Sequence, residues 1–506
     1  CSPALQGKVL QQSDIIHWKG MAQKSFEYKE THGHFPLWTT SLFSGMPAYQ
    51  VAISAYNPVP VGYLQYLFTL GLPKPLNFFF LMCISFYFLS QVLRVNYRIG
   101  ILGSLAYAYM SFTAIIVAVG HETQALTMGY MPFLLGAFIL VYNKKYFIGA
   151  ALSALFTNLL VGMNHPQIVY YFLITAACMT IAYAIQWIRQ GQIKHMLTCF
   201  AILIICGSAG VASNMVVLAT TYDYSKATMR GGTLNLDTAT NQQRASSGLP
   251  IDYAFRWSYG TGETMSLLIP NVYGGASGGG VLDGNSAFAK KATGIGVPED
   301  QATQFAASMS TYWGDQPFTS GPVYLGAIIC LLFVLGMFYL PGCDKWWILT
   351  ACVFAILMSW GKNLMGFNSF LFDYMPLYNK FRAPSMSLVI PQFLFPVLGI
   401  MFLQKLFFDE KDKTLAWKKI KTGGYVMLGI FGVAALLYTS FTYKPADDQM
   451  LNYITQATGG KEDIAKSLYG ALAADRQSMF GSDLLRSLFF AGIAFVLIWA
   501  YLPNNV

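Results

Sequence analysis

The sequence predicts an all-α polytopic membrane protein with about eleven transmembrane helices. Hydrophobic residues make up 55% of its 506 residues and charged residues only 11%, and the mean hydropathy is +0.45. Soluble domains carry about 25% charged residues. Here the charged residues and histidines are concentrated between apolar stretches, and every second connection is basic. These observations indicate that the bilayer organises the chain.

The apolar stretches have the length of membrane spans. A hydrocarbon core of about 30 Å requires roughly 20 apolar residues in a helix. A shorter apolar segment at 59–72 is interrupted by Gly71 and followed by Pro73, so we expect it to be interfacial or re-entrant. The predicted spans are 76–95, 100–119, 126–142, 147–163, 168–188, 196–219, 322–340, 346–360, 386–407, 423–441 and 485–502.

Alternate connections between these spans are basic, and the positive-inside rule places them in the cytoplasm. They contain Arg94 and Arg98, Lys144 and Lys145, Arg189 and Lys194, Lys345, and the lysine-rich run 411–421. The organisation that follows is a first extracytoplasmic loop at 1–58, an N-terminal bundle at 59–219, a large extracytoplasmic loop at 220–321 and a C-terminal bundle at 322–506.

The composition also weighs against several classes of protein. The net charge of +9 arises largely from the basic connections, so it indicates topology and not nucleic-acid binding. Seven of the eight cysteines lie within or at the ends of apolar runs, which predicts no disulfide framework. The span interiors lack ionisable residues, which disfavours an ion-coupled transporter. The glycine-rich run 274–280 follows no strand–helix unit and does not indicate nucleotide binding.

Three connections on the predicted extracytoplasmic face carry candidate chemistry. Asp14 lies among apolar neighbours in the first loop, where a carboxylate suits a general base or a cation ligand. The alternative is a helix N-cap formed by Ser13 or Asp14. The tight connections Gly120-His121-Glu122 and Asn164-His165-Pro166 each carry a histidine, and the alternative for Glu122 is a helix cap in a solvated turn. We expect these polar residues to cluster.

Basic residues on the same predicted face are candidates for binding a phosphate, because arginine can donate two parallel hydrogen bonds to it. Arg382 stands directly before a span. The alternative for Arg382 is a side chain that only reaches out to the membrane interface. The full set of candidates is Lys226, Arg230, Arg244, Arg256, Lys362 and Arg382.

Several short motifs, in this order, resemble the YfhO family of bacterial membrane proteins, which is related to the GT-C superfamily of polyprenyl-phosphate-sugar-dependent glycosyltransferases. The resemblance covers most of the chain, and the order of the motifs is more specific than any one of them. The motifs are the Asp14 loop with Phe35-Pro36-Leu37-Trp38 and Gly45-Met46-Pro47, then Gly120-His121-Glu122, YWGDQPFTSGPVY from Tyr312 to Tyr324, and Arg382-Ala383-Pro384-Ser385.

The resemblance implies a GT-C-like bundle in the bacterial inner membrane, with its active site at the extracytoplasmic surface. Asp14 is then the catalytic base, assisted by His121 and Glu122, and substrate binding is expected from His165, Arg382, Arg256 and Trp38. The implied partners are a polyprenyl-phosphate-linked sugar, an envelope glycan, lipid or protein acceptor, and membrane lipid. No cofactor is required, but Mg²⁺ or Mn²⁺ would use Asp14 and Glu122. Family members are longer, so we expect a further N-terminal span and a further C-terminal part.

Two other functions fit the same layout. A flippase or exporter of lipid-linked saccharides would use charges in the loops and at the interface. A non-catalytic membrane scaffold for envelope assembly would need no polar site, and the polar character of the outer connections weighs against it.

Overall fold

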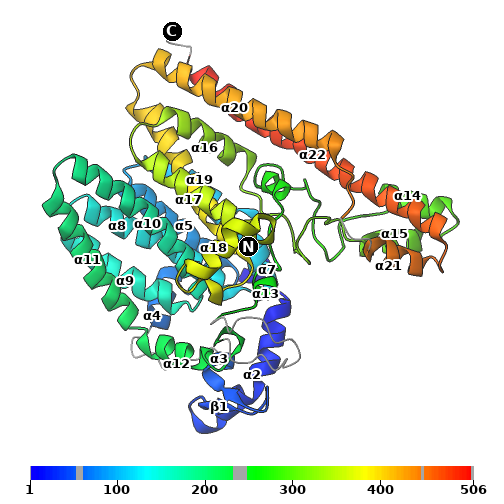
Figure 1. Ribbon diagram of the computed structural model, residues 1–506, viewed down its shortest axis with the longest axis horizontal. Coiled ribbons are helices and arrows are strands. Elements are labelled where there is room, and N and C mark those ends of the chain that lie inside the picture. Colours follow the sequence, from blue (N-terminus) through cyan, green and yellow to red (C-terminus); the bar gives the residue numbers. More distant parts are fainter. Residues whose placement is uncertain (1, 53–60, 232–247, 446–448, 503–506) are drawn as a thin grey trace. The chain divides into compact units, whose positions relative to one another are not determined.

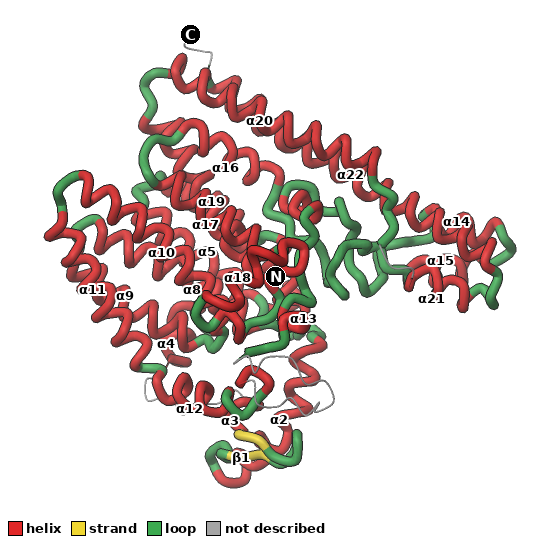
Figure 2. Tube along the Cα trace, in the orientation of Figure 1, coloured by secondary structure: helices red, strands yellow, loops and turns green. Residues whose placement is uncertain are grey.

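The computed structural model describes residues 2–52, 61–231, 248–445 and 449–502. The chain divides into two compact units, which are described separately. Unit 1 comprises residues 1–109, 113–253 and 372–381, and unit 2 comprises residues 110–112, 254–371 and 382–506. Figure 2 shows that the described chain is mostly helical, with loops and one short antiparallel strand pair, which confirms the all-α prediction.

Most of unit 1 is built from apolar helices that follow one another through tight turns. In order, its elements are α1 (Ser2–Leu5), α2 (Ser13–His32), β1 (Trp38–Thr39), β2 (Met46–Pro47), α3 (Ala48–Ala52), α4 (Val61–Thr69), α5 (Leu76–Val92), α6 (Tyr97–Ala108), α7 (Ser111–Val119), α8 (Glu122–Tyr142), α9 (Tyr146–Gly162), α10 (Pro166–Arg189), α11 (Ile193–Ala212), α12 (Met215–Ser225) and the short 3₁₀ turns η1 (Met229–Gly231) and η4 (Tyr378–Lys380).

Helix α8 is the core of unit 1, because almost all of its side chains are buried. It packs against α5 and α9, as Figure 1 shows. Gly129 and Gly136 allow this close approach, since a Cβ at either position would meet Leu81 or Phe88 of α5. Small residues serve the same purpose in other membrane helix pairs. The middle of α8 is therefore packed closely against α5.

The two ends of these helices differ in character. At one end, His195 joins the connections that follow α8 and α10, because its ring contacts Tyr142 O at 3.0 Å and Tyr146 Oη at 2.6 Å. Lys144, Lys145, Arg189 and Lys194 belong to these same connections. The opposite ends carry the connections with His121 and His165. Within unit 1, Lys144, Lys145, Arg189 and Lys194 thus lie at the opposite ends of these helices from His121 and His165.

Unit 2 has a second set of apolar helices and a long, partly helical connection. Its elements are α13 (Ile251–Ala254), η2 (Gly262–Leu267), α14 (Ala287–Gly294), α15 (Glu299–Ser308), α16 (Ala327–Tyr339), α17 (Asp344–Ser359), η3 (Gly361–Leu364), α18 (Met365–Tyr374), η5 (Pro384–Leu388), α19 (Val389–Gln404), the π-helix η6 (Lys405–Asp409), α20 (Lys413–Ser440), α21 (Gln449–Ala457) and α22 (Glu462–Tyr501); α7, α13 and α18 extend across the boundary between the units.

Helix α19 is the buried centre of unit 2, and α16 and α17 pack against it. Helices α20 and α22 lie side by side and antiparallel (Figure 1), since Lys413 meets Tyr501 and Tyr438 meets Phe480. The first half of α22 continues beyond the apolar part and forms a small core with α14, α15 and α21. The predicted loop 220–321 therefore contains the packed helices α14 and α15.

The number of spans is confirmed only in part. Six helices are long and apolar enough to cross a membrane, and eight segments qualify if the bent pairs α6–α7 and α17–α18 each count as one. Helices α5, α9 and α16 are apolar but shorter. Described helices overlap all eleven predicted spans, but the predicted spans 100–119 and 196–219 are each divided between two helices. The chain therefore has the character of a multi-pass membrane protein, and the count of eleven stays a prediction.

Candidate functional site

The start of α2 is seated on the connection between α7 and α8. Gln12 precedes the helix and is buried, and its Nε2 donates to the carbonyl of Val117 at 2.5 Å. Gly120 has φ +107°, and a Cβ there would lie 3.0 Å from Ile15 Cγ1. Only glycine adopts this backbone readily and leaves room for α2. Two segments far apart in sequence are thereby brought together.

Asp14 and His121 meet at this junction. The Nε2 atom of His121 lies 2.9 Å from Asp14 Oδ2, and the two side chains are 40% and 48% exposed. Asp14 lies in the first turn of α2, whereas the N-cap residue is Gln12 and no side chain caps the helix. The interpretation of Ser13 or Asp14 as the N-cap is therefore wrong. The pair is open to solvent.

The tautomer of His121 follows from this contact. A neutral imidazole carries its hydrogen on Nε2 when that atom donates to a carboxylate, which leaves Nδ1 as the basic atom. His121 is the residue before α8, and its side chain makes no capping hydrogen bond. The Nδ1 atom of His121 therefore does not cap α8.

His165 is the third member of the group. Burial, and next the neighbouring His121, lower the pKa of His165 to about 4. Its Nδ1 accepts the backbone N–H of Ile168 at 3.3 Å and so caps α10. His165 is therefore neutral at physiological pH. The structure thus brings Asp14 into contact with His121, and His165 lies near His121.

Glu122 belongs to a different contact. Its Oε2 lies 2.5 Å from the Nζ of Lys74, a residue that sequence reasoning missed, and its side chain is only 18% exposed. A carboxylate in the first turn of α8 also interacts favourably with the helix dipole. Glu122 therefore holds the start of α8 in position, and its negative charge is matched by Lys74.

The donor set does not fit a divalent cation. Mg²⁺ and Mn²⁺ prefer several oxygen ligands. Asp14 and Glu122 face His121 and Lys74 instead, and among the described residues no group of three His, Cys, Asp or Glu side chains could hold a metal. We therefore derive no step through a metal ion.

Gln124, one turn into α8, is a further polar residue that sequence reasoning missed. It is 1% exposed, and within the described chain neither its Oε1 nor its Nε2 has a hydrogen-bond partner. An unpaired buried amide costs folding free energy. Gln124 is thus a buried amide beside the histidine-bearing connection, and its two polar atoms make no hydrogen bond within the described chain.

Trp38 is not brought to this group. It lies in β1, its side chain is 57% exposed, and its indole covers Gly45, which has φ +130°. The surrounding segment packs on Ala22 and Phe26 of α2. Ala22 is about two helical turns beyond Asp14. The strand pair and α2 are seen together in Figure 1.

In unit 2, Arg256 and Arg382 share one aromatic ring. Their guanidinium carbons lie 5.6 and 5.7 Å from the centroid of Trp257, and Phe318 meets that indole edge-on at 5.3 Å. The backbone N–H of Ala383 donates to Ala254 O at 3.0 Å, which joins the two segments. Both arginines are exposed. A pair of guanidinium groups on one indole is a suitable phosphate site.

The other basic candidates form different contacts or lie outside the described residues. Lys226 pairs with Asp223, Arg230 donates to the carbonyl of Lys380, and Lys362 donates to the carbonyl of Asp315. Arg244 lies outside the described residues.

Unit 2 also contains a titratable group that sequence reasoning missed. Glu263 is 2% exposed and accepts hydrogen bonds from Tyr312 Oη at 2.6 Å and Gly260 N at 2.5 Å. The pKa of Glu263 is raised to about 7, chiefly by burial and also by nearby Asp315, and the hydrogen bonds from Tyr312 and Gly260 oppose this rise. Tyr312 begins the motif that runs to Tyr324, and Glu263 follows Gly262. Neither sequence context predicts that these two side chains are in contact.

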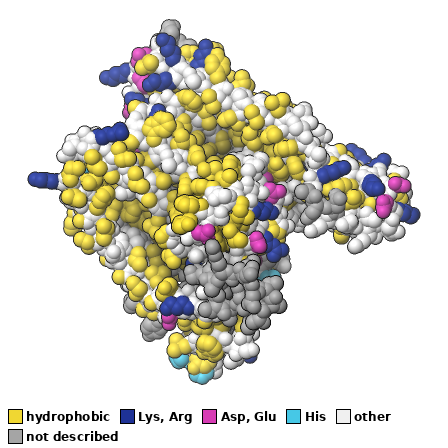
Figure 3. Space-filling model, viewed as in Figure 1, with side chains coloured by type: hydrophobic (Ala, Val, Ile, Leu, Met, Phe, Trp, Pro, Cys, Tyr) yellow, Lys and Arg dark blue, Asp and Glu magenta, His cyan; other side chains and the backbone are white. Residues whose placement is uncertain are grey.

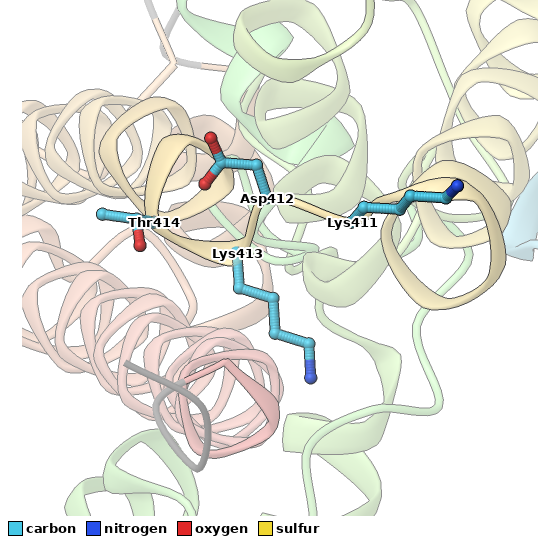
Figure 4. A pocket seen from close by; sticks show the side chains of 4 residues that line it. All are labelled: Lys411, Asp412, Lys413 and Thr414. Carbon is cyan, nitrogen blue, oxygen red and sulfur yellow. The ribbon is translucent and has the colours of Figure 1, made fainter.

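One hollow lies away from all of these groups. It has a volume of about 470 Å³ and is lined by Lys411, Asp412, Lys413 and Thr414, in the turn before α20 (Figure 4). It is shallow and open to solvent, so we do not assign chemistry to it.

Comparison of the chain with protein-family models, with curated proteins and with solved structures finds no match. The resemblance to the YfhO family therefore rests on the sequence motifs alone.

Proposed function

We propose that the protein is an inner-membrane glycosyltransferase that moves a sugar from a polyprenyl phosphate to a cell-envelope acceptor on the extracytoplasmic face. The observation that carries this proposal is the contact between Asp14 and His121. A carboxylate that holds a solvent-accessible imidazole is a common arrangement for general-base catalysis. A lipid donor suits a group at the end of apolar helices, because its chain stays in the bilayer.

The reaction is a displacement at the anomeric carbon. The acceptor hydroxyl gives its proton to the Asp14–His121 pair, at Nδ1 of His121 or at the second oxygen of Asp14. The acceptor oxygen then bonds to the anomeric carbon, the bond from that carbon to the phosphate oxygen breaks, and polyprenyl phosphate leaves. Attack opposite the leaving group inverts the configuration of the sugar.

The neutral state of His165 assists the proton transfer. When His121 accepts a proton it becomes a cation, and a charged neighbour would repel it. His165 stays uncharged because its pKa is lowered to about 4. The carboxylate of Asp14 stabilises the imidazolium from the other side.

Arg256 and Arg382 are our candidates for binding the phosphate within unit 2. Stacking on Trp257 restricts both side chains, so less entropy is lost when they bind an anion.

The test is release of polyprenyl phosphate by the protein in lipid nanodiscs, supplied with polyprenyl-phosphate hexoses and envelope extract. Asp14→Asn keeps the shape of the side chain but removes its charge, and we expect a loss of roughly 10²-fold or more. Asp223→Asn is the matched control, because Asp223 forms a similar exposed pair with Lys226 at 2.9 Å. Equal release by the two variants would leave Asp14 and His121 as a surface ion pair.

A further inference from the structure

A groove runs between α16, α20 and α22 in unit 2. Its volume is about 360 Å³, which is in the range of about 300–1,000 Å³ typical of small-molecule sites. The lining is almost wholly apolar, and Lys421 is its one charged residue. The lining residues come from all three helices: Leu331 from α16, Trp417 to Phe431 from α20, and Leu488 to Phe495 from α22.

The groove exists because two lining positions are glycines. A Cβ on Gly424 would lie 2.6 Å from the ring of Phe495, so glycine lets that ring pack against α20. Gly492 has nothing within 4 Å of its Cβ position, so it leaves open space. Tyr425, Leu428 and Leu488 line the groove and are themselves exposed. The groove thus opens on the outer, apolar side of the helices.

The length of the groove matches one leaflet of a bilayer. From Lys421 to Phe431, α20 advances roughly 15 Å at 1.5 Å per residue. This is about half of a hydrocarbon core of roughly 30 Å. Lys421 stands two residues before the predicted span at 423–441, and Trp417 lies one turn earlier, as expected for groups at the headgroup level.

The polar end of the groove carries an excess of positive charge. Six lysines and three carboxylates lie between residues 405 and 421. Two of the carboxylates serve the backbone: Glu410 accepts from Lys411 N, and Asp412 caps α20 by accepting from Leu415 N. Figure 3 shows Lys and Arg side chains gathered at this end of α20, and in Figure 4 Lys413 extends toward α22. The end therefore attracts an anion.

We infer that this groove binds an anionic glycerophospholipid from the leaflet at the basic end of the helices. The phosphate lies at Lys421 beside Trp417, and one acyl chain follows the groove to Phe431. The apolar lining accounts for the chain, and the lysine excess accounts for the charge of the headgroup. This site is separate from the Asp14–His121 pair and does not depend on glycosyl transfer.

The test compares two lipids with identical acyl chains, phosphatidylglycerol and phosphatidylcholine, mixed equally in the nanodiscs that hold the full chain. After extraction into mild detergent, native mass spectrometry counts the lipids retained on the protein. We expect one retained phosphatidylglycerol and a preference of about fivefold or more over phosphatidylcholine, the effect of one nearby lysine. Lys421→Ala should abolish the preference, whereas Lys419→Ala, which changes an exposed lysine outside the groove, should keep it.

A second pair of variants tests the groove itself. Gly492→Leu fills the open space and should remove the retained lipid. Gly429→Leu is the matched control, because Gly429 also has nothing within 4 Å of its Cβ position but does not line the groove. Equal retention of the two lipids by the unaltered protein, or full retention by Gly492→Leu, would overturn the inference. A preference lost in both lysine variants would show only general attraction of the basic end for anionic lipid, and would overturn it as well.

Discussion

At the scale of single residues, Glu263 is expected to make the stability of the folded protein depend on pH. Its pKa is near 4.5 in the unfolded chain and about 7 in the folded one. Below pH 4.5 the carboxyl is neutral in both states. Between pH 4.5 and 7 the unfolded state ionises and the folded state does not, so folding is progressively disfavoured. Above pH 7 the loss of unfolding free energy due to Glu263 is constant, at most about 3 kcal/mol.

Glu263→Gln keeps a neutral side chain at every pH, so its thermal midpoint should fall less than that of the unaltered protein between pH 5 and 8. At pH 8 the variant should be the more stable of the two. Glu462→Gln, which alters an exposed carboxylate paired with Lys466, serves as the control. Parallel pH curves for Glu263→Gln and the unaltered protein would show that Glu263 titrates normally. Differential scanning fluorimetry in detergent measures these midpoints.

Arg382 makes a second residue-scale prediction. If it holds the leaving phosphate, Arg382→Lys should slow turnover by an amount that corresponds to roughly 2–4 kcal/mol, as for other groups that stabilise transition-state charge. Lysine keeps the charge but cannot donate two parallel hydrogen bonds. Arg98→Lys is a matched control, since Arg98 also lies over an aromatic ring, that of Tyr97, at 5.5 Å. Equal turnover by the two variants would leave Arg382 as an interface arginine.

At the scale of elements, the seat of α2 on the connection before α8 sets the position of Asp14. Gly120→Ala places a Cβ against Ile15 and Gln12 and forces an unfavourable φ. We expect faster amide hydrogen exchange at the start of α2 and slower sugar transfer, while the helical bundle stays folded. Gly20→Ala is the control, because Gly20 in α2 has open space and no positive φ. Unchanged exchange in Gly120→Ala would show that Gly120 is not needed for the seat.

The elements also show which features of the fold could be predicted from the sequence. Hydropathy located a helix at each predicted span, since apolar length alone marks a membrane helix. The cluster of Asp14, His121 and His165 was predicted from their shared face. The partners Lys74 and Tyr312 were not predicted, because their contacts with Glu122 and Glu263 depend on packing between segments about 48 residues apart or more. The packed helices within 220–321 were also missed, since their polar composition suggested a loop.

At the scale of the whole molecule, the topology can be tested directly. In a variant without native cysteines, a cysteine at position 123 should react with an impermeant thiol reagent added outside intact cells. A cysteine at position 414, in the basic turn before α20, should be protected until the cells are opened. These outcomes follow from the positive-inside rule. The opposite pattern would move the Asp14–His121 pair to the cytoplasmic face and contradict the proposed reaction.

The most direct test of the proposed function is an experimental structure of the Asp14→Asn variant with a polyprenyl-phosphate sugar, because this variant should bind the donor without consuming it. The expected result is donor density whose anomeric carbon is close enough to His121 for one acceptor oxygen to lie between them. Density for the sugar phosphate elsewhere on the protein, with His121 facing only solvent, would contradict the role of the Asp14–His121 pair as the base.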